Sequence, residues 1–173
     1  PNTARKWAGL LETSGVVARV EPYFGNRTTR LIKAPKFVFL DTGLAAFLAG
    51  FRSVRELTES PLIGAFWESH IFGQLVRQAA SRAETRPICY WRTAGGAEVD
   101  VVIERAGMLT AVECKWTEHP RDVDTKGLKA IEAAEPGKVK QKMIVCRTNT
   151  TYRLSDGTWV VNTSDALKRL ASA

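Results

Sequence analysis

Residues 98–116 read EVDVVIERAGMLTAVECKW, two runs of β-branched and apolar residues on either side of Ala106-Gly107. Apolar runs joined by two residues that tolerate a tight turn predict a β-hairpin, with strands at 98–104 and 108–116. Charged residues interrupt both runs. Because a charge is costly to bury, its presence in an otherwise apolar strand requires a physical reason.

The alternation of side chains along a strand predicts which residues share a face. Glu98 and Asp100 are expected on one face of the first strand, opposite Val99, Val101 and Ile103. Glu113 and Lys115 are expected on one face of the second strand, opposite Val112, Cys114 and Trp116. A two-residue loop at Ala106-Gly107 then places Asp100 opposite Glu113 and Glu98 opposite Lys115.

Two directly opposed carboxylates repel each other, and a divalent cation between them removes this penalty. Carboxylate oxygens together with retained water suit Mg²⁺ or Mn²⁺, which we predict as the cofactor of Asp100 and Glu113. Lys115 beside the metal would polarise an attacking water or stabilise charge that develops on a phosphate. The alternative is an internal salt-bridge network that only orders the sheet, in which Glu98 pairs with Lys115 or Arg92.

A further carboxylate, Glu68, belongs to the longest predicted helix, residues 62–82, which follows Pro61. Its neighbours at helical spacing are apolar, so Glu68 is expected on the face that meets the sheet. An inward carboxylate needs a cation or hydrogen-bond donors, and we predict Glu68 as a third metal ligand or an organiser of water. The apolar neighbours are Ile71, Phe72, Leu75 and Ala79.

The order of the remaining patterns predicts the architecture. One helix, three consecutive strands, another helix and a strand are typical of a mixed α/β sandwich. The predicted elements are helices at 4–12, 44–49, 62–82, 123–134 and 164–170, strands at 16–24, 29–40, 88–92, 98–104, 108–116 and 139–146, and a short hairpin at 152–161.

The N-terminal segment is an incomplete unit, because one helix and a long hairpin leave an apolar face uncovered. It resembles the last helix and the wing of a winged helix-turn-helix domain. We therefore expect a partial winged helix at residues 1–40 and a second domain at 41–173, and we interpret the chain as the C-terminal piece of a longer protein.

The composition is that of a globular protein with a basic surplus, since 25 Lys and Arg against 18 Asp and Glu give a net charge of +7. Such a surplus favours a polyanionic partner. Arg92 is a candidate to guide a phosphate, although it also fits a tight turn. Lys138, Lys140 and Lys142 are candidates to contact successive backbone phosphates. Alternatively, they protect a sheet edge or simply lie on a solvent-exposed face. Arg27, Arg30, Lys33 and Lys36 lie on the wing-like hairpin, where they would contact a DNA backbone or a partner module.

The three cysteines, Cys89, Cys114 and Cys146, form no C-x-x-C pair and indicate buried thiols in a reducing cytoplasm rather than disulfides or a zinc site. No apolar run approaches the length of a membrane span, and no export signal is present, so we expect a soluble cytoplasmic protein without a membrane partner. A G-x-x-x-x-G-K-[ST] phosphate loop is absent, which excludes ATP hydrolysis by that route.

Glu68 on a helix, Glu98-Val99-Asp100 and Glu113-Cys114-Lys115 resemble the three motifs of the PD-(D/E)XK nuclease superfamily, the restriction-endonuclease-like fold. Longer phrases are similar to the domain of unknown function found C-terminal to AAA-type ATPases of bacteria and archaea, over nearly the whole chain. These phrases are KAPKFVFLDTGLAAFLAG, GAFWESHIFGQLVRQ and YWRTAGGAEVDVVIE. Two departures are E-V-D in place of P-D, and Trp116 where resolvase-like relatives often carry a polar residue.

The resemblance implies a restriction-endonuclease-like mixed sheet flanked by helices, with metal at Asp100 and Glu113, an assisting Lys115 and a helix-borne Glu68. It also implies an ATPase module in the same longer chain and nucleic acid, DNA rather than RNA, as substrate. Two alternatives remain open. The first is an inactive nuclease-fold module that binds nucleic acid or couples the ATPase to a partner, and the second is a structural domain through which the ATPase oligomerises.

Overall fold

The computed structural model describes residues 2–25, 34–84 and 87–172. Its centre is a six-stranded mixed sheet in the order β3-β4-β5-β6-β8-β7. The predicted mixed α/β class is confirmed at this level. The strands of this sheet are β3 (Ile88–Arg92), β4 (Glu98–Arg105), β5 (Met108–Cys114), β6 (Val139–Val145), β7 (Tyr152–Arg153) and β8 (Trp159–Val161).

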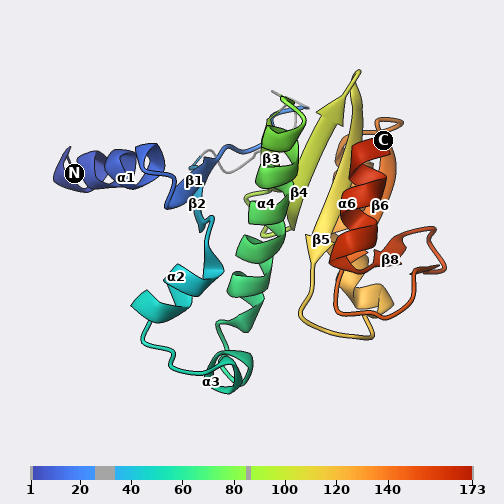
Figure 1. Cartoon of the computed structure of the whole chain (residues 1–173). Helices are drawn as coiled ribbons and strands as arrows, with labels where there is room; N and C mark the ends of the chain where they lie inside the picture. The colour runs from blue at the N-terminus through green and yellow to red at the C-terminus, as the bar shows by residue number, and fades with distance from the viewer. Residues whose placement is uncertain (1, 26–33, 85–86, 173) are drawn as a thin grey trace.

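Helices cover both faces of the sheet, as Figure 1 shows. α4 (Ile63–Ser81) and α6 (Thr163–Ser172) lie over one face, where Phe72, Leu75 and Leu170 join a core with Val101. α5 (Lys126–Ala134), which follows the short 3-10 helix η1 (Asp122–Thr125), covers the other face through Leu128 and Ile131. The longest helix therefore follows the predicted periodicity.

The hairpin of β4 and β5 has the predicted register, with pairs from Arg105–Met108 to Val101–Val112. Ala106 and Gly107 form the turn with φ of 48° and 79°. Positive φ at both residues is the conformation that matches the twist of the two strands. The ladder ends one residue short of Asp100 and Glu113, so these two carboxylates lie where the strands begin to separate.

A β-bulge in β4 changes the predicted faces. Trp91 pairs with Val99, whereas Cys89 pairs with Val102. One residue of β3, Tyr90, therefore lies opposite two residues of β4, Asp100 and Val101, and the alternation of side chains shifts by one. The expectation that Val99 shares a face with Val101 and Ile103 is wrong. Val99 packs instead with Val102 in the core beneath α5.

The N-terminal elements lie beside α4 rather than in the main sheet. β1 (Val17–Val20) and β2 (Lys36–Phe39) form a two-stranded antiparallel sheet within the predicted strands at 16–24 and 29–40, of which residues 29–33 lie outside the described residues. Val20 and Val38 belong to the same core as α4, while α1 (Asn2–Thr13) extends away from the main sheet (Figure 1). The predicted turn at Gly25-Asn26 falls partly outside the described residues.

Two short helices connect β2 to α4. α2 (Thr42–Leu48) begins as predicted after Asp41, whose side chain accepts a hydrogen bond from the Leu44 amide at 2.9 Å. α3 (Val54–Thr58) follows, capped by Ser53. None of the helices in the described ranges combines the length and apolarity that a membrane crossing requires.

α5 begins in close contact with β4, which leaves no room for a side chain at Gly127. A Cβ there would overlap the carbonyl oxygen of Glu98 and lie 3.3 Å from Oε2 of Glu113. We expect Gly127→Ala to lower the free energy of unfolding by about 1–3 kcal/mol, because a backbone must move. Gly64→Ala in α4 is the control, since its Cβ would contact nothing within 4 Å. It should leave stability unchanged or raise it by up to about 1 kcal/mol. Urea denaturation measures both, and equal effects would contradict the packing of α5.

Candidate functional site

The strongest candidate site is a cavity of about 400 Å³ at the open end of the β4–β5 hairpin, closed on one side by the start of α5. It combines buried carboxylates with cationic side chains. Its charged lining residues are Glu98, Asp100, Glu113, Lys115, Asp124 and Lys126. The sequence-predicted Asp100, Glu113 and Lys115 therefore line the same cavity.

Asp100 lies at the bulge of β4, where its carboxylate, in place of a backbone carbonyl, accepts a hydrogen bond from β5. The backbone N–H of Cys114 donates to Oδ2 of Asp100 at 2.8 Å. Burial, together with the nearby charges of Glu113 and Glu68, raises the pKa of Asp100 to about 8. Without a cation the side chain is therefore largely protonated at neutral pH.

Glu113 is a buried carboxylate whose two oxygens have different environments. Oε1 forms an ion pair with Nζ of Lys115 at 2.8 Å. Oε2 is buried and has no hydrogen-bond partner among the described residues. Burial raises the pKa of Glu113 even though the Lys115 ammonium opposes the shift. A buried carboxylate oxygen without a partner is expensive, and a bound cation would offset that cost.

Lys115 follows the last residue of β5 and remains attached to the sheet, because its amide donates to the Val145 carbonyl at 3.0 Å. Burial alone would lower the pKa of Lys115, but the ion pair with Glu113 raises it. The lysine is therefore a permanent cation. It forms its ion pair with Glu113 of its own strand, while Glu98 lines the same cavity. The predicted pairing of Glu98 opposite Lys115 lies beyond the end of the ladder and stays a prediction.

Glu68 points from α4 toward this region but has a different partner. Nζ of Lys36, on β2, lies 3.0 Å from Oε1 of Glu68 and also forms an ion pair with Glu98. Glu98 further contacts Arg92, with 3.5 Å between Nε and Oε2, as the salt-bridge alternative predicted. Glu68 is close enough to raise the pKa values of Asp100 and Glu113 through its charge, so all four carboxylates share one electrostatic region.

Trp67 fixes the part of α4 that carries Glu68. Its indole N–H donates to the Val145 carbonyl at 3.1 Å, and its ring meets the edge of Trp116 with 5.3 Å between centroids. Because Val145 also accepts from the Lys115 amide, Glu68 and Lys115 are both anchored to the end of β6.

The predicted phosphate-binding residues are not gathered around this cavity. Lys138 and Lys142 form ion pairs with Glu135 and Glu132 of the α5 region, at 2.8 and 2.7 Å. Lys140 is exposed on β6, which pairs with β8 only from Met143 onward, so the suggestion that these lysines protect a sheet edge stays a prediction. The predicted contacts of Arg30 and Lys33 fall outside the described residues.

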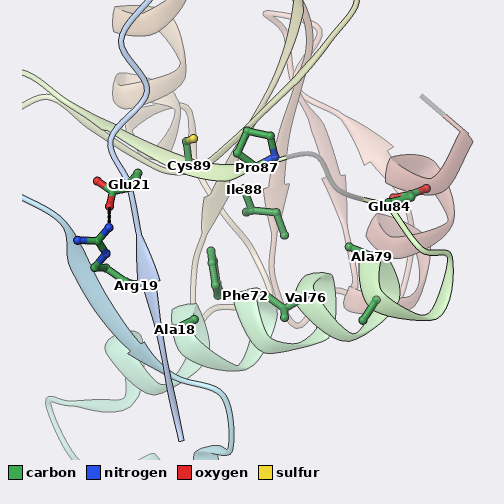
Figure 2. Close-up of a pocket in the computed structure, with 11 residues that line it drawn as sticks. Ala18, Arg19, Glu21, Phe72, Val76, Ala79, Glu84, Pro87, Ile88 and Cys89 are labelled. Atoms are coloured by element: carbon green, nitrogen blue, oxygen red, sulfur yellow. Dashed lines mark ion pairs between the residues drawn. The ribbon is translucent and has the colours of Figure 1, made fainter. Parts of the chain in front are cut away.

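A second cavity, of about 390 Å³, lies between β1, α4 and β3 (Figure 2). Phe72, Val76 and Ile88 make its interior apolar, and Arg19 and Glu21 form an ion pair of 2.7 Å at its rim. It lacks the buried carboxylates that chemistry at phosphate requires. The hairpin cavity is therefore the better candidate.

The fit of the hairpin cavity to a divalent cation rests on two residues. Asp100 and Glu113 offer carboxylate oxygens of the type Mg²⁺ and Mn²⁺ prefer, and Glu113 has an oxygen without a partner. Within the described ranges no group of three or more His, Cys, Asp and Glu side chains is arranged to hold a metal ion. The predicted third ligand, Glu68, is paired with Lys36 instead.

Comparison with known proteins assigns the chain to a family. Residues 63–166 match the family described as "Domain of unknown function (DUF4143)", and residues 1–55 match "Domain of unknown function (DUF8612)". The chain belongs to the DUF4143 family. This confirms the resemblance to a domain of unknown function, while membership of the PD-(D/E)XK superfamily stays a prediction.

Two mycobacterial proteins are similar to the DUF4143 chain. They are the uncharacterized proteins Mb2031c of Mycobacterium bovis and Rv2008c of Mycobacterium tuberculosis, each 35% identical over 118 residues. The match covers 68% of this chain but only 26% of each relative. The chain thus spans about a quarter of the length of these relatives. No solved structure matches it.

Sequence reasoning missed three residues of the DUF4143 site. Lys36 was assigned to a wing surface, yet it pairs with carboxylates of α4 and β4. Asp124 and Lys126 line the cavity because η1 and α5 begin there. No local pattern in the sequence indicates these contacts, since each depends on segments that are distant along the chain.

The protonation of Asp100 predicts a pH dependence of stability. Its pKa is about 8 in the folded protein and near 3.9 when unfolded, so the folded state holds more protons between these values. The free energy of unfolding of the metal-free protein should therefore fall by roughly 2–5 kcal/mol from pH 4 to pH 8. Asp100→Asn should reduce this fall, because an amide does not ionise.

Urea denaturation in EDTA at several pH values measures the effect. Asp122→Asn makes the same chemical change on an exposed side chain and serves as the control. A wild-type protein whose stability changes with pH in the same way as that of Asp100→Asn would show that Asp100 is not protonated on folding.

Proposed function

We propose that this DUF4143 domain is a metal-dependent nuclease domain of the PD-(D/E)XK type, which hydrolyses phosphodiester bonds of DNA. One observation carries the proposal. The partly buried Asp100 and the buried Glu113 line one cavity beside Lys115, and Oε2 of Glu113 has no hydrogen-bond partner among the described residues. The mixed sheet with helices on both faces is compatible with a restriction-endonuclease-like core.

Asp100 and Glu113 would hold Mg²⁺ or Mn²⁺, and Glu68 is the proposed third ligand. A cation bound there supplies charge neutralisation and a Lewis acid for phosphate oxygens. A bound cation would also become the partner of Oε2 of Glu113, which would offset the free-energy cost of burying that oxygen without a partner. The Cys114 amide holds Asp100 through one oxygen and leaves the other for the cation.

The raised pKa of Lys115 favours the second of its two predicted roles, stabilisation of charge on the phosphate. A lysine that stays protonated carries a positive charge but cannot take the proton from the attacking water. It acts instead as a fixed positive charge that stabilises the phosphate oxygens as water adds to phosphorus and the bond to the leaving oxygen breaks. Its attachment to β6 through the Val145 carbonyl keeps that charge in place.

The net charge of +7 supports a polyanionic substrate. Arg92 and Lys126 are exposed next to the acidic pair and are suited to contact backbone phosphates. The family resemblance supports a cytoplasmic setting in which an ATPase module of the same longer chain accompanies the domain. In that arrangement the ATPase would deliver or remodel the DNA that the domain cleaves.

A second candidate function is favoured by one observation. Glu68 is held by Lys36, and the described residues contain no ready group of three metal-ligating side chains. A nuclease fold without productive metal binding would then serve as a module that binds nucleic acid or couples the ATPase to a partner. Calorimetric titration with Mn²⁺ separates the two functions, because the module predicts no binding at millimolar concentration.

Cleavage of several DNA forms in the presence of Mn²⁺ tests the nuclease. We expect Asp100→Asn and Lys115→Ala to lower the rate by at least about 100-fold, because each removes a charge on which the site depends. Lys129→Ala is the control, since Lys129 lies on α5 outside the cavity and pairs with Asp156 at 3.7 Å. Activity that persists in both site variants would exclude this site.

A further inference from the structure

Lys36 is the unexpected member of the acidic region. It comes from β2, outside the main sheet, and contacts carboxylates of two other elements, Glu68 on α4 and Glu98 on β4. The three side chains are 24%, 26% and 29% exposed, which sets this contact apart from a fully solvated surface pair. A partly buried ammonium between two carboxylates occupies the position that a mobile cation would otherwise fill.

Tyr90 holds Lys36 in this position. The Lys36 Nζ lies 5.0 Å from the centre of the Tyr90 ring, and the Tyr90 hydroxyl donates to the carbonyl of Ala34, two residues before the lysine. The two carboxylates raise the pKa of Lys36 despite its burial. The lysine is therefore a permanent charge on a strand whose backbone is anchored next to the site.

The ion pair with Lys36 determines where the Glu68 carboxylate points. α4 itself is fixed, because Trp67 donates to the Val145 carbonyl. The charge of Glu68 nevertheless acts on both Asp100 and Glu113. A change in the Lys36–Glu68 ion pair would therefore change the charge that acts on these two carboxylates.

We propose that Lys36 is a positioning residue that competes with the divalent cation for Glu68. While the ion pair exists, Glu68 is withheld and the site has two carboxylate ligands. When the pair opens, Glu68 becomes available as the third. The N-terminal two-stranded sheet thereby sets the metal affinity of a site on the main sheet. This inference rests on the proposed metal site and adds a control element to it.

Calorimetric titration with Mn²⁺ tests the competition without relying on catalysis. Lys36→Met should bind Mn²⁺ at least about tenfold more tightly than the wild type, because Glu68 is released. In the double variant Lys36→Met with Glu68→Gln this gain should disappear. Such a cycle isolates the coupling between the two residues from the general effect of lost charge.

Lys126→Met is the matched control, because it removes one positive charge from the cavity rim without touching Glu68. It should change the affinity by less than about threefold, as expected for an exposed charge. If circular dichroism shows that Lys36→Met does not fold, Lys36→Gln replaces it with the same expectation. Unchanged or weaker binding by the Lys36 variant, or a gain that survives Glu68→Gln, overturns the competition.

The outcomes also distinguish a failure of the Lys36 competition from a failure of the proposed metal site. If the wild type binds Mn²⁺, Asp100→Asn abolishes binding and the Lys36 variant gains nothing, only the competition fails. If neither the wild type nor the Lys36 variant binds Mn²⁺, the metal site fails and the competition fails with it. Tighter binding by the Lys36 variant that depends on Glu68 supports both.

Discussion

Repulsion between buried carboxylates is the constraint from which the rest of the site follows. Asp100 and Glu113 lie at the end of one hairpin, where the ladder has stopped, and Glu113 is buried while Asp100 is partly buried. In a low-dielectric region like charges at such positions cannot both remain ionised without compensation. The cation-free protein supplies three forms of compensation, which are a proton on Asp100, the ammonium of Lys115 and the amide of Cys114.

The compensation is incomplete. Among the described residues one oxygen of Glu113 is buried without a hydrogen-bond partner, and this favours the proposed metal site over a purely structural salt-bridge network. Glu68 and Glu98, by contrast, form ion pairs with Lys36, and Glu98 also pairs with Arg92. The cavity is lined by Glu98, Asp100 and Glu113.

The sequence predicted those parts of the fold that local chemistry determines. The turn at Ala106-Gly107 requires positive φ at two residues, which determined the register of β4 and β5 and brought Asp100 and Glu113 together. The bulge at Asp100 was not predictable, because it depends on how Tyr90 of β3 packs against β4. Lys36 was missed for a similar reason. Its partner Glu68 lies 32 residues away, and nothing in the local pattern distinguishes it from a lysine exposed on a wing.

The position of Lys36 also bears on how the N-terminal segment relates to the main sheet. A division at residue 40 stays a prediction, but Val20 and Val38 share a core with Phe72 of α4. The hairpin is therefore held by apolar packing through Val38 and by the ion pairs of Lys36, two residues earlier on the same strand. In the proposed competition a divalent cation would oppose the ion pair but not the apolar packing. The polar contact would then loosen while the apolar contact retains the strand, so that the lysine leaves Glu68 without unfolding of the protein.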